Sequence, residues 1–440
     1  MDSFSINCLK KSNYFASISV SQTQFQENKS LETTSLEEFN LKQQRVHLID
    51  GMRGLSLFGI LLANLLIFQY GIWGKDDLSL APIDNGAYTF VKVFIEGSFM
   101  PIFTFLFGYS IVKMTESLQH KGLKVKRYFV RRFVFLILLG ILHGTFLWEG
   151  DILTFYGVFG FFLLFFIRRK KRTILIWGLI LFVLMNAIML IGASFGGELD
   201  STEEFVASDS YLEKMNEIYA TGTYAEIYHF RNNEDPMSDL PGALVFVVFI
   251  LSPVIMAPLF LFGMYAARIQ LFKSPLQEGA WYLKATLLLV PLGILMKGAG
   301  ELVPLSGWTD FLIGSGAPIL ALGYIFAFAY LYTKMDGSII MRAFESVGKL
   351  SLTNYIMQTV ICTTIFYGYG LGLFGKLGVL NGILLGILIF VIQCISSTFY
   401  LRFVPRGPLE FILRIWTNLS WNGRAKTNIS NPSIASKSEV

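Results

Sequence analysis

The stretch RVHLIDGMRGLSLFGILLANLLIFQYGIW, residues 45–73, places charged side chains directly before a long apolar run. The run over residues 55–73 is close to the roughly 20 apolar residues that an α-helix needs to cross a bilayer. Arg45, Asp50 and Arg53 stand at its start, where charges are costly unless they have partners or a function. The stretch therefore predicts a transmembrane helix with a polar entrance.

The whole chain has the composition of a multi-spanning membrane protein. Of its 440 residues, 53% are hydrophobic and only 15% are charged, and the mean hydropathy is +0.55, outside the range of soluble globular proteins. We expect an all-α polytopic bundle of about ten transmembrane helices. Their apolar runs lie near residues 54–73, 97–114, 133–149, 151–167, 173–194, 242–267, 279–299, 309–333, 349–370 and 377–401.

Charge in the loops predicts how these helices are oriented. Lys and Arg gather around residues 121–132 and again at 168–172, and the positive-inside rule puts both loops in the cytoplasm. The loop over residues 195–241 is rich in Asp and Glu and is expected to be extracytoplasmic. An even number of spans then places both termini in the cytoplasm. This asymmetry accounts for the net charge of +5, so we expect membrane lipids as partners and no nucleic acid.

Polar segments flank the predicted membrane domain, residues 45–415. Residues 1–44 are rich in Ser, Gln and Glu and predict a cytosolic, disordered extension without the apolar segment of a signal peptide. Residues 416–440 predict a cytosolic polar tail. The three cysteines lack metal-binding and redox spacing, so we expect no metal and no disulfide framework. The sequence also lacks a Walker loop, which argues against an ATP-driven pump.

The first predicted helix carries one polar stripe. Arg53 and Asn64 are eleven residues apart, which at about 100° per residue returns to nearly the same face. Asp50 and Arg53 could pair with each other or with lipid headgroups, while Asn64 joins helices. Alternatively, Arg45 and Arg53 form an anion site for a cytosolic phosphate-bearing ligand, with Asp50 orienting Arg53.

A second polar group is predicted around the stretch LWEGD, residues 147–151. His143 precedes this stretch and shares a helix face with Arg132, eleven residues earlier. Glu149 and Asp151 follow in a tight outer turn, and Glu96 begins another helix at the same end. His143 could be a hydrogen-bonded packing residue, or a general base whose tautomer and basicity the neighbouring carboxylates set.

The stretch VGKLSLTNYIMQT, residues 347–359, opens another apolar run with a polar stripe. Ser351, Asn354 and Gln358 are spaced i, i+3 and i+7, a pattern typical of hydrogen bonds between membrane helices. The same stripe could instead line a cavity, with Tyr355 offering a flat surface to an adenine or a pantetheine arm. The stretch RFVPRGPLE, residues 402–410, adds a basic patch that fits anchoring to lipid headgroups.

Several of these stretches together resemble a known family. RVHLIDGMRG at 45–54, GILHGTFLWEGDIL at 140–153, VGKLSLTNYIMQT at 347–359 and RGPLE at 406–410 are similar to motifs of the YeiB-like bacterial membrane proteins, catalogued as domain of unknown function 418. The resemblance spans roughly residues 45–415 and implies a multi-pass protein of the bacterial cell membrane.

That family in turn resembles the transmembrane acyltransferases, which include heparan-alpha-glucosaminide N-acetyltransferase. The resemblance implies transfer of an acyl group from cytosolic acyl-CoA to an acceptor on the far side of the membrane, and it matches best at Asp50, Arg53 and Asn64. The heparan branch has a functional His in the loop after its first helix, whereas residues 71–95 contain none. His143 would have to supply the base from another helix.

These observations leave three hypotheses. The first is an acyltransferase with acyl-CoA as co-substrate and an extracytoplasmic hydroxyl or amine as acceptor. Its cofactor-binding residues would be Arg45, Asp50, Arg53, Arg132, Asn354 and Gln358, and its catalytic residues His143, Asp151, Asn64, Glu96 and Glu149. In this scheme His143 deprotonates the acceptor and Asn64 donates a hydrogen bond to the developing oxyanion. The alternatives are a transporter for a small organic solute and a membrane protein without catalytic activity.

Overall fold

The computed structural model describes residues 46–76, 78–195, 209–234, 256–303 and 308–423. These residues form helices and turns and no strand, as the composition predicts. The first helix spans Val46–Tyr70, and an unlabelled helix covers residues 256–268. The others are α2 (Pro82–Phe90), η1 (Val91–Ile95), α3 (Phe99–His120), α4 (Val125–Phe146), α5 (Leu153–Leu163), α6 (Lys171–Phe195), α7 (Asp209–Thr221), α8 (Tyr224–Asn233), α10 (Gly279–Leu302), α11 (Trp308–Met335), α12 (Ile339–Lys349), α13 (Ser351–Phe366), α14 (Val379–Phe403) and α15 (Pro408–Asn418).

Seven helices of the described part are long and apolar enough to cross a membrane. They are the first helix, the composite element Pro82–His120, α4, α6, α10, α11 and α14. Two other predicted spans are shorter than expected. The run 151–167 contains only α5, whose 11 residues extend about 16 Å, and the run 349–370 contains the 16-residue α13. The predicted span 242–267 lies partly outside the described residues.

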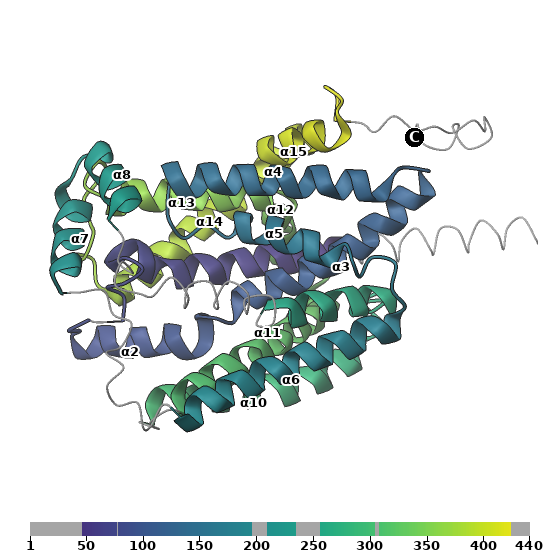
Figure 1. Ribbon diagram of the computed structural model, residues 1–440, viewed down its shortest axis with the longest axis horizontal. Helices are drawn as coiled ribbons and strands as arrows, with labels where there is room; N and C mark the ends of the chain where they lie inside the picture. Colours follow the sequence, from purple (N-terminus) through teal and green to yellow (C-terminus); the bar gives the residue numbers. More distant parts are fainter. Residues whose placement is uncertain (1–45, 77, 196–208, 235–255, 304–307, 424–440) are drawn as a thin grey trace, which may run out of the picture.

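The long helices are arranged around the first helix (Figure 1). On one side α6, α10 and α11 lie together, with α11 in contact with both of the others. On the other side lie α4, α13, α14 and α15, and α15 packs against α4. The short helices α7 and α8 sit at one end of the bundle, where α8 contacts α4.

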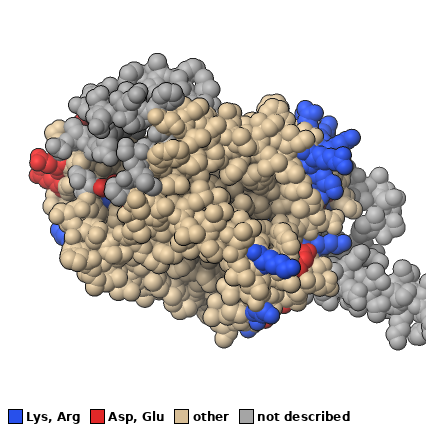
Figure 2. Space-filling model, turned by 90° about the horizontal axis from the view of Figure 1, so that it is seen from below, with Lys and Arg blue, Asp and Glu red and all other residues tan. Residues whose placement is uncertain are grey.

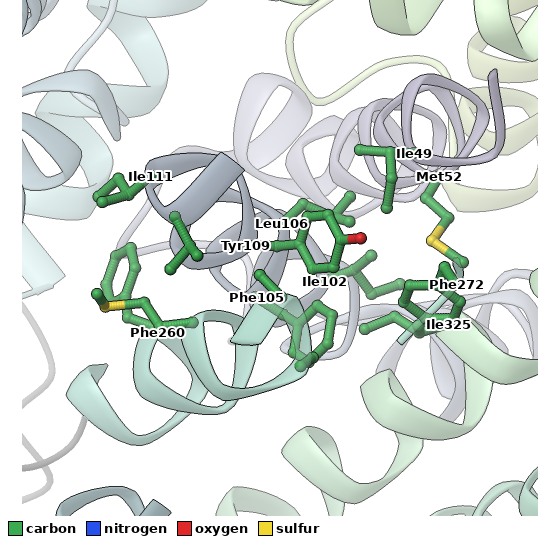
Figure 3. Close-up of a cluster of buried hydrophobic side chains, with 14 of the residues drawn as sticks. Ile49, Met52, Ile102, Phe105, Leu106, Tyr109, Ile111, Phe260, Phe272 and Ile325 are labelled. Atoms are coloured by element: carbon green, nitrogen blue, oxygen red, sulfur yellow. The ribbon is translucent and has the colours of Figure 1, made fainter. Parts of the chain in front are cut away.

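Apolar side chains of the first helix and α3 begin one of the two cores (Figure 3). Ile49 and Met52 face Tyr109 of α3, and the cluster continues to Phe260 and Ile325. A second core joins the remainder of the first helix to α13, α14, α7 and α8. The first helix therefore buries apolar side chains in both cores.

Charged side chains gather at the two ends of the molecule. On the face shown in Figure 2, most Lys and Arg side chains lie near one end, a group of acidic side chains lies at the other, and the surface between them is uncharged. This distribution fits a protein whose middle is surrounded by lipid. By the positive-inside rule, the basic end is expected to face the cytoplasm.

The composite element Pro82–His120 is broken between η1 and α3. Lys297 of α10 is 1% exposed, and its Nζ donates to the Glu96 carbonyl oxygen at 2.5 Å and to Ser98 Oγ at 3.1 Å. Each unsatisfied carbonyl at such a break costs several kcal/mol in lipid. Lys297 therefore supplies the donor that the broken helix needs.

Candidate functional site

The guanidinium group of Arg53 bonds two side chains near the start of the first helix. Arg53 donates to Asp50 Oδ1 at 2.6 Å and to Ser110 Oγ of α3, also at 2.6 Å. Asp50 is buried, so the pair fixes the Arg53 head between two helices. Asp50 thus has the orienting contact that the sequence predicted for it.

Asp50 and Arg53 line a cavity of about 390 Å³ that opens among the first helix, α3, α4, α13 and α15. Its walls carry five cationic side chains and two carboxylates, Asp50 and Glu410. The cations are Arg53, Arg132, Lys349, Arg406 and Arg414. The excess of positive charge makes this mouth an anion-attracting surface.

The cavity becomes apolar away from its mouth. Its inner walls come from the first helix, α3 and α4, and they include Leu57, Ile60, Phe103, Leu106, Phe107 and Leu136. Its lining also includes Ile152, Leu153, Tyr156 and Tyr355. A ligand that fits this space has an anionic group at one end and a slender, less polar arm at the other.

The RGPLE stretch builds part of the mouth. Glu410 of α15 accepts hydrogen bonds from the Leu352 and Thr353 amides at 2.8 and 3.1 Å and from Thr353 Oγ1 at 2.6 Å, so it caps the start of α13. A Cβ on Gly407 would lie 2.0 Å from Glu410 Oε2, which leaves room there only for glycine. The RGPLE stretch, predicted to anchor to lipid, thus joins α13 to α15 and places Arg406 in the cavity wall.

His143 lies in a hydrogen-bonded line across three elements. Its Nδ1 is 3.0 Å from Asp151 Oδ1, and its Nε2 is 3.0 Å from Thr359 Oγ1 of α13. The imidazole is buried, and the residue is 2% exposed. The structure thus brings together the predicted base and one of its two predicted orienting carboxylates.

Asp151 is itself fixed in place by the start of α5. Its carboxylate accepts hydrogen bonds from the Leu153 and Thr154 amides at 3.1 and 2.8 Å. Burial raises the pKa of Asp151, but the hydrogen bonds from His143 and from these amides outweigh it, and the net shift of the pKa is downward. An ionised Asp151 can only accept, so His143 Nδ1 carries a hydrogen. When Nδ1 carries the only ring hydrogen, Nε2 can accept a hydrogen bond from the Thr359 hydroxyl.

Close packing of α4 on α5 makes this contact possible. A Cβ on Gly140 would lie 2.3 Å from the Thr154 amide nitrogen and 2.5 Å from Asp151 Oδ2. Any larger residue at 140 would push Asp151 away from the imidazole, which is one turn along α4. The glycine of GILHG thus positions the carboxylate.

Tyr355 lies next to His143 and also lines the cavity. It belongs to the cavity wall, and its ring centroid is 5.2 Å from that of His143. Its hydroxyl lies 3.3 Å from the Ile152 amide nitrogen and 3.4 Å from the Gly150 carbonyl oxygen. These distances are at the long end for hydrogen bonds, so the phenol is positioned mainly by packing of its ring, which is buried in the second core.

Two carboxylates predicted near His143 have other partners. Glu149 accepts from the Tyr219 hydroxyl of α7 at 3.0 Å and lies 3.7 Å from Arg231 of α8. Glu96 pairs with Lys75 at 2.7 Å and with Lys92 at 3.1 Å. The predicted convergence of these carboxylates on His143 is therefore limited to Asp151.

Three of the remaining predicted residues, Asn354, Gln358 and Asn64, do not line the cavity. Asn354 donates to Ser397 Oγ of α14 at 3.1 Å, and Gln358 donates to Gln393 Oε1 at 2.9 Å, so both join helices. Asn64 is partly exposed and does not line the cavity. Arg45 lies outside the described residues.

Three members of the site were not singled out from the sequence. Lys349 and Arg414 face the mouth, and Thr359 bonds His143. Thr359 follows Ser351 and Tyr355 at intervals of four, so a search for polar residues along one helix face could have found it. Nothing in the local sequence distinguishes Lys349 or Arg414 from an ordinary interfacial cation.

Comparisons with known proteins give relatives along nearly the whole chain. The family described as protein of unknown function (DUF418) matches residues 266–420. The uncharacterized protein YxaH of Bacillus subtilis (strain 168) is 31% identical over 398 residues, covering 88% of this chain and 97% of its own length. The uncharacterized protein YeiB of Escherichia coli (strain K12) is 25% identical over 398 residues, covering 83% and 94%. No solved structure matches.

Proposed function

Since this chain belongs to the family of proteins of unknown function DUF418, we propose a function from its own site. The protein is a membrane-embedded acyltransferase that moves an acyl group from cytosolic acyl-CoA to a hydroxyl or amine acceptor on the opposite side. The observation that carries this proposal is the cavity, whose basic mouth and apolar interior extend to Tyr355, directly beside His143.

The mouth suits the phosphates of an acyl-CoA. Arg53, with Asp50 and Ser110 as fixed partners, presents a preoriented guanidinium, the group best suited to phosphate oxygens. Arg132 and Arg414 extend the positive surface across α4 and α15. Charge of one sign around a low-dielectric cavity raises the local concentration of an anionic substrate.

The interior suits a pantetheine arm. From Arg53 to Ile60 the first helix advances about 10 Å at 1.5 Å per residue, and both residues line the cavity. The arm would carry the thioester from the charged mouth towards Tyr355. His143, oriented by Asp151, would then supply the base that acyl transfer to a hydroxyl or amine requires.

Direct binding tests the donor. We expect calorimetry on the detergent-purified protein to detect acetyl-CoA and longer acyl-CoAs, and Arg53→Ala to weaken this binding by about 10- to 100-fold, the range for loss of a charged hydrogen bond. His143→Ala should bind acetyl-CoA nearly as well as the wild type, since His143 does not line the cavity. Raising the salt concentration should weaken binding through screening of the mouth.

A matched control separates the cavity from the general charge of this end. Arg127 is an exposed cation of α4 that does not line the cavity, so Arg127→Ala should leave acetyl-CoA binding unchanged. Equal losses for Arg53→Ala and Arg127→Ala would indicate diffuse charge attraction instead of a site. Absence of binding across the acyl-CoA series would contradict the proposal and favour tests of solute transport.

A further inference from the structure

The hydroxyl of Thr359 differs in its partner from those of Thr115 and Thr364. Thr115 and Thr364 each donate to the carbonyl oxygen four residues earlier in their own helix, the usual arrangement for a helical threonine. Thr359 instead bonds His143 Nε2 on another helix. Thr359 and His143 are 1% and 2% exposed, so water does not compete for this contact.

The line Thr359, His143, Asp151 has the geometry of an activated nucleophile. A hydroxyl contacts the imidazole at 3.0 Å, and the other imidazole nitrogen contacts a carboxylate at 3.0 Å. An ionised Asp151 accepts from Nδ1, and in that tautomer of the imidazole Nε2 can accept from the threonine hydroxyl. This is the pattern by which a base, oriented by a third group, prepares a hydroxyl for attack.

We propose that Thr359 is the covalent nucleophile of the transfer and carries the acyl group between donor and acceptor. This inference depends on the proposed acyltransferase function. Thr359 Oγ1 attacks the thioester carbonyl carbon, and its proton passes to His143 Nε2. The C–O bond forms, the C–S bond breaks, and the imidazolium returns the proton to the departing thiolate, releasing CoA with a free thiol.

The second half reverses the roles of the two oxygens. The acceptor hydroxyl or amine attacks the acyl ester on Thr359, and His143 takes the acceptor's proton. As the ester bond breaks, His143 returns that proton to Thr359 Oγ1, which restores the starting state. Asp151 remains ionised throughout and stabilises the imidazolium in each half.

The cavity meets this line at Tyr355. Ser351 and Tyr355 both line the cavity, and Thr359 is one helical turn further along α13, about 6 Å at 1.5 Å per residue. Tyr355 lies between them, held by two long hydrogen bonds. In this mechanism the Tyr355 phenol turns aside to let the thioester reach Thr359.

The first half-reaction can be measured without knowing the acceptor. The full-length protein in detergent is incubated with acetyl-CoA, released CoA thiol is counted, and mass spectrometry of the intact chain and its peptides locates any added acetyl group. Thr359→Val removes the hydroxyl while keeping the shape, and Thr359→Ser keeps a hydroxyl. Thr363→Val is the matched control, because Thr363 is equally buried one turn away, donates to the Val360 carbonyl and has no contact with His143 in the described part of the chain.

The proposal predicts one acetyl group on Thr359 and a burst of one CoA per protein. The label should be lost in Thr359→Val, kept on the new hydroxyl in Thr359→Ser, and unchanged in Thr363→Val. If Thr359→Val binds acetyl-CoA like the wild type and still acquires the label, or if the wild type binds acetyl-CoA and acquires none, the covalent step is overturned while the donor site stands. Lack of acetyl-CoA binding would overturn both.

Discussion

Two buried polar groups within the membrane helices differ in what they contact. The imidazole of His143 bonds only side chains, Asp151 and Thr359, from two other elements. The ammonium of Lys297 bonds the Glu96 carbonyl oxygen and Ser98 at the break between η1 and α3. An intramembrane ionisable residue is by default a candidate for function. We expect its partners to distinguish a catalytic role, as proposed for His143, from a structural role, as for Lys297.

The surroundings of the two groups differ in the same way. His143 is adjacent to Tyr355, which lines the cavity. Lys297 satisfies the Glu96 carbonyl, which a continuous helix would satisfy by itself. We therefore expect changes at His143 to affect transfer more than stability, and changes at Lys297 to affect stability more than transfer.

The largest effect is expected at His143. Glutamine can keep one hydrogen bond to Thr359 but cannot take up its proton, so His143→Gln should lower the rate of CoA release from acetyl-CoA by about 10²- to 10⁴-fold, the usual contribution of a general base. The melting temperature should change much less. His229 is exposed on α8, and His229→Gln should leave the rate unchanged. A His143→Gln protein that releases CoA at the wild-type rate would remove the imidazole from the mechanism.

A smaller effect, on a different quantity, is expected at Lys297. Lys297→Met keeps an unbranched side chain but leaves the Glu96 carbonyl and Ser98 without their donor, and we expect the free energy of unfolding to fall by about 1–3 kcal/mol. Acetyl-CoA binding per folded molecule should not change. Lys284 is exposed on the same helix, so Lys284→Met is the control. If Lys297→Met has unchanged stability but impaired CoA release, Lys297 acts in transfer as His143 does, and the contrast between the two residues is wrong.

The sequence alone predicted the helical membrane class and part of the site. Spacing on one helix put Asp50 beside Arg53, and nearness in the chain put Asp151 beside His143, because both relations depend on local geometry. Glu149 and Glu96 were predicted to converge with His143, but in the structure they have other partners. Their partners, Arg231 and Lys75 among them, come from distant segments whose packing no spacing rule contains.

Hydropathy also could not tell which apolar runs become long helices. Residues 151–167 are as apolar as a spanning helix, yet the helix ends at Leu163 and turns follow. Packing against the protein stabilises this short segment, because Leu163, Phe166 and Ile167 are buried in the first core. A transfer scale measures how apolar a residue is, and protein and lipid satisfy that preference equally well.

The smallest effect is expected at Asp76, which is linked through two lysines to Glu96, at the break between η1 and α3. Asp76 lies 2.6 Å from Lys75 and 2.9 Å from Lys92, and both lysines also bond Glu96. Burial raises the pKa of Asp76, but the hydrogen bonds and charges of these lysines outweigh it and lower the pKa to about 2. A carboxyl with a lowered pKa stabilises the fold above its usual pKa of about 4, and this contribution is lost as the pH falls towards 2.

Asp76→Asn therefore tests how much the break depends on charge. Because the Asp76 side chain is 53% exposed, solvent screening limits the expected loss to about 0–1 kcal/mol. The melting temperature of Asp76→Asn should lie slightly below that of the wild type at pH 7, and the gap should close as the pH approaches 2. Asp310→Asn, at an exposed carboxylate of α11, controls for net charge. A gap that persists at low pH would mean that Asp76 acts through shape, and that Lys297 alone supports the broken helix.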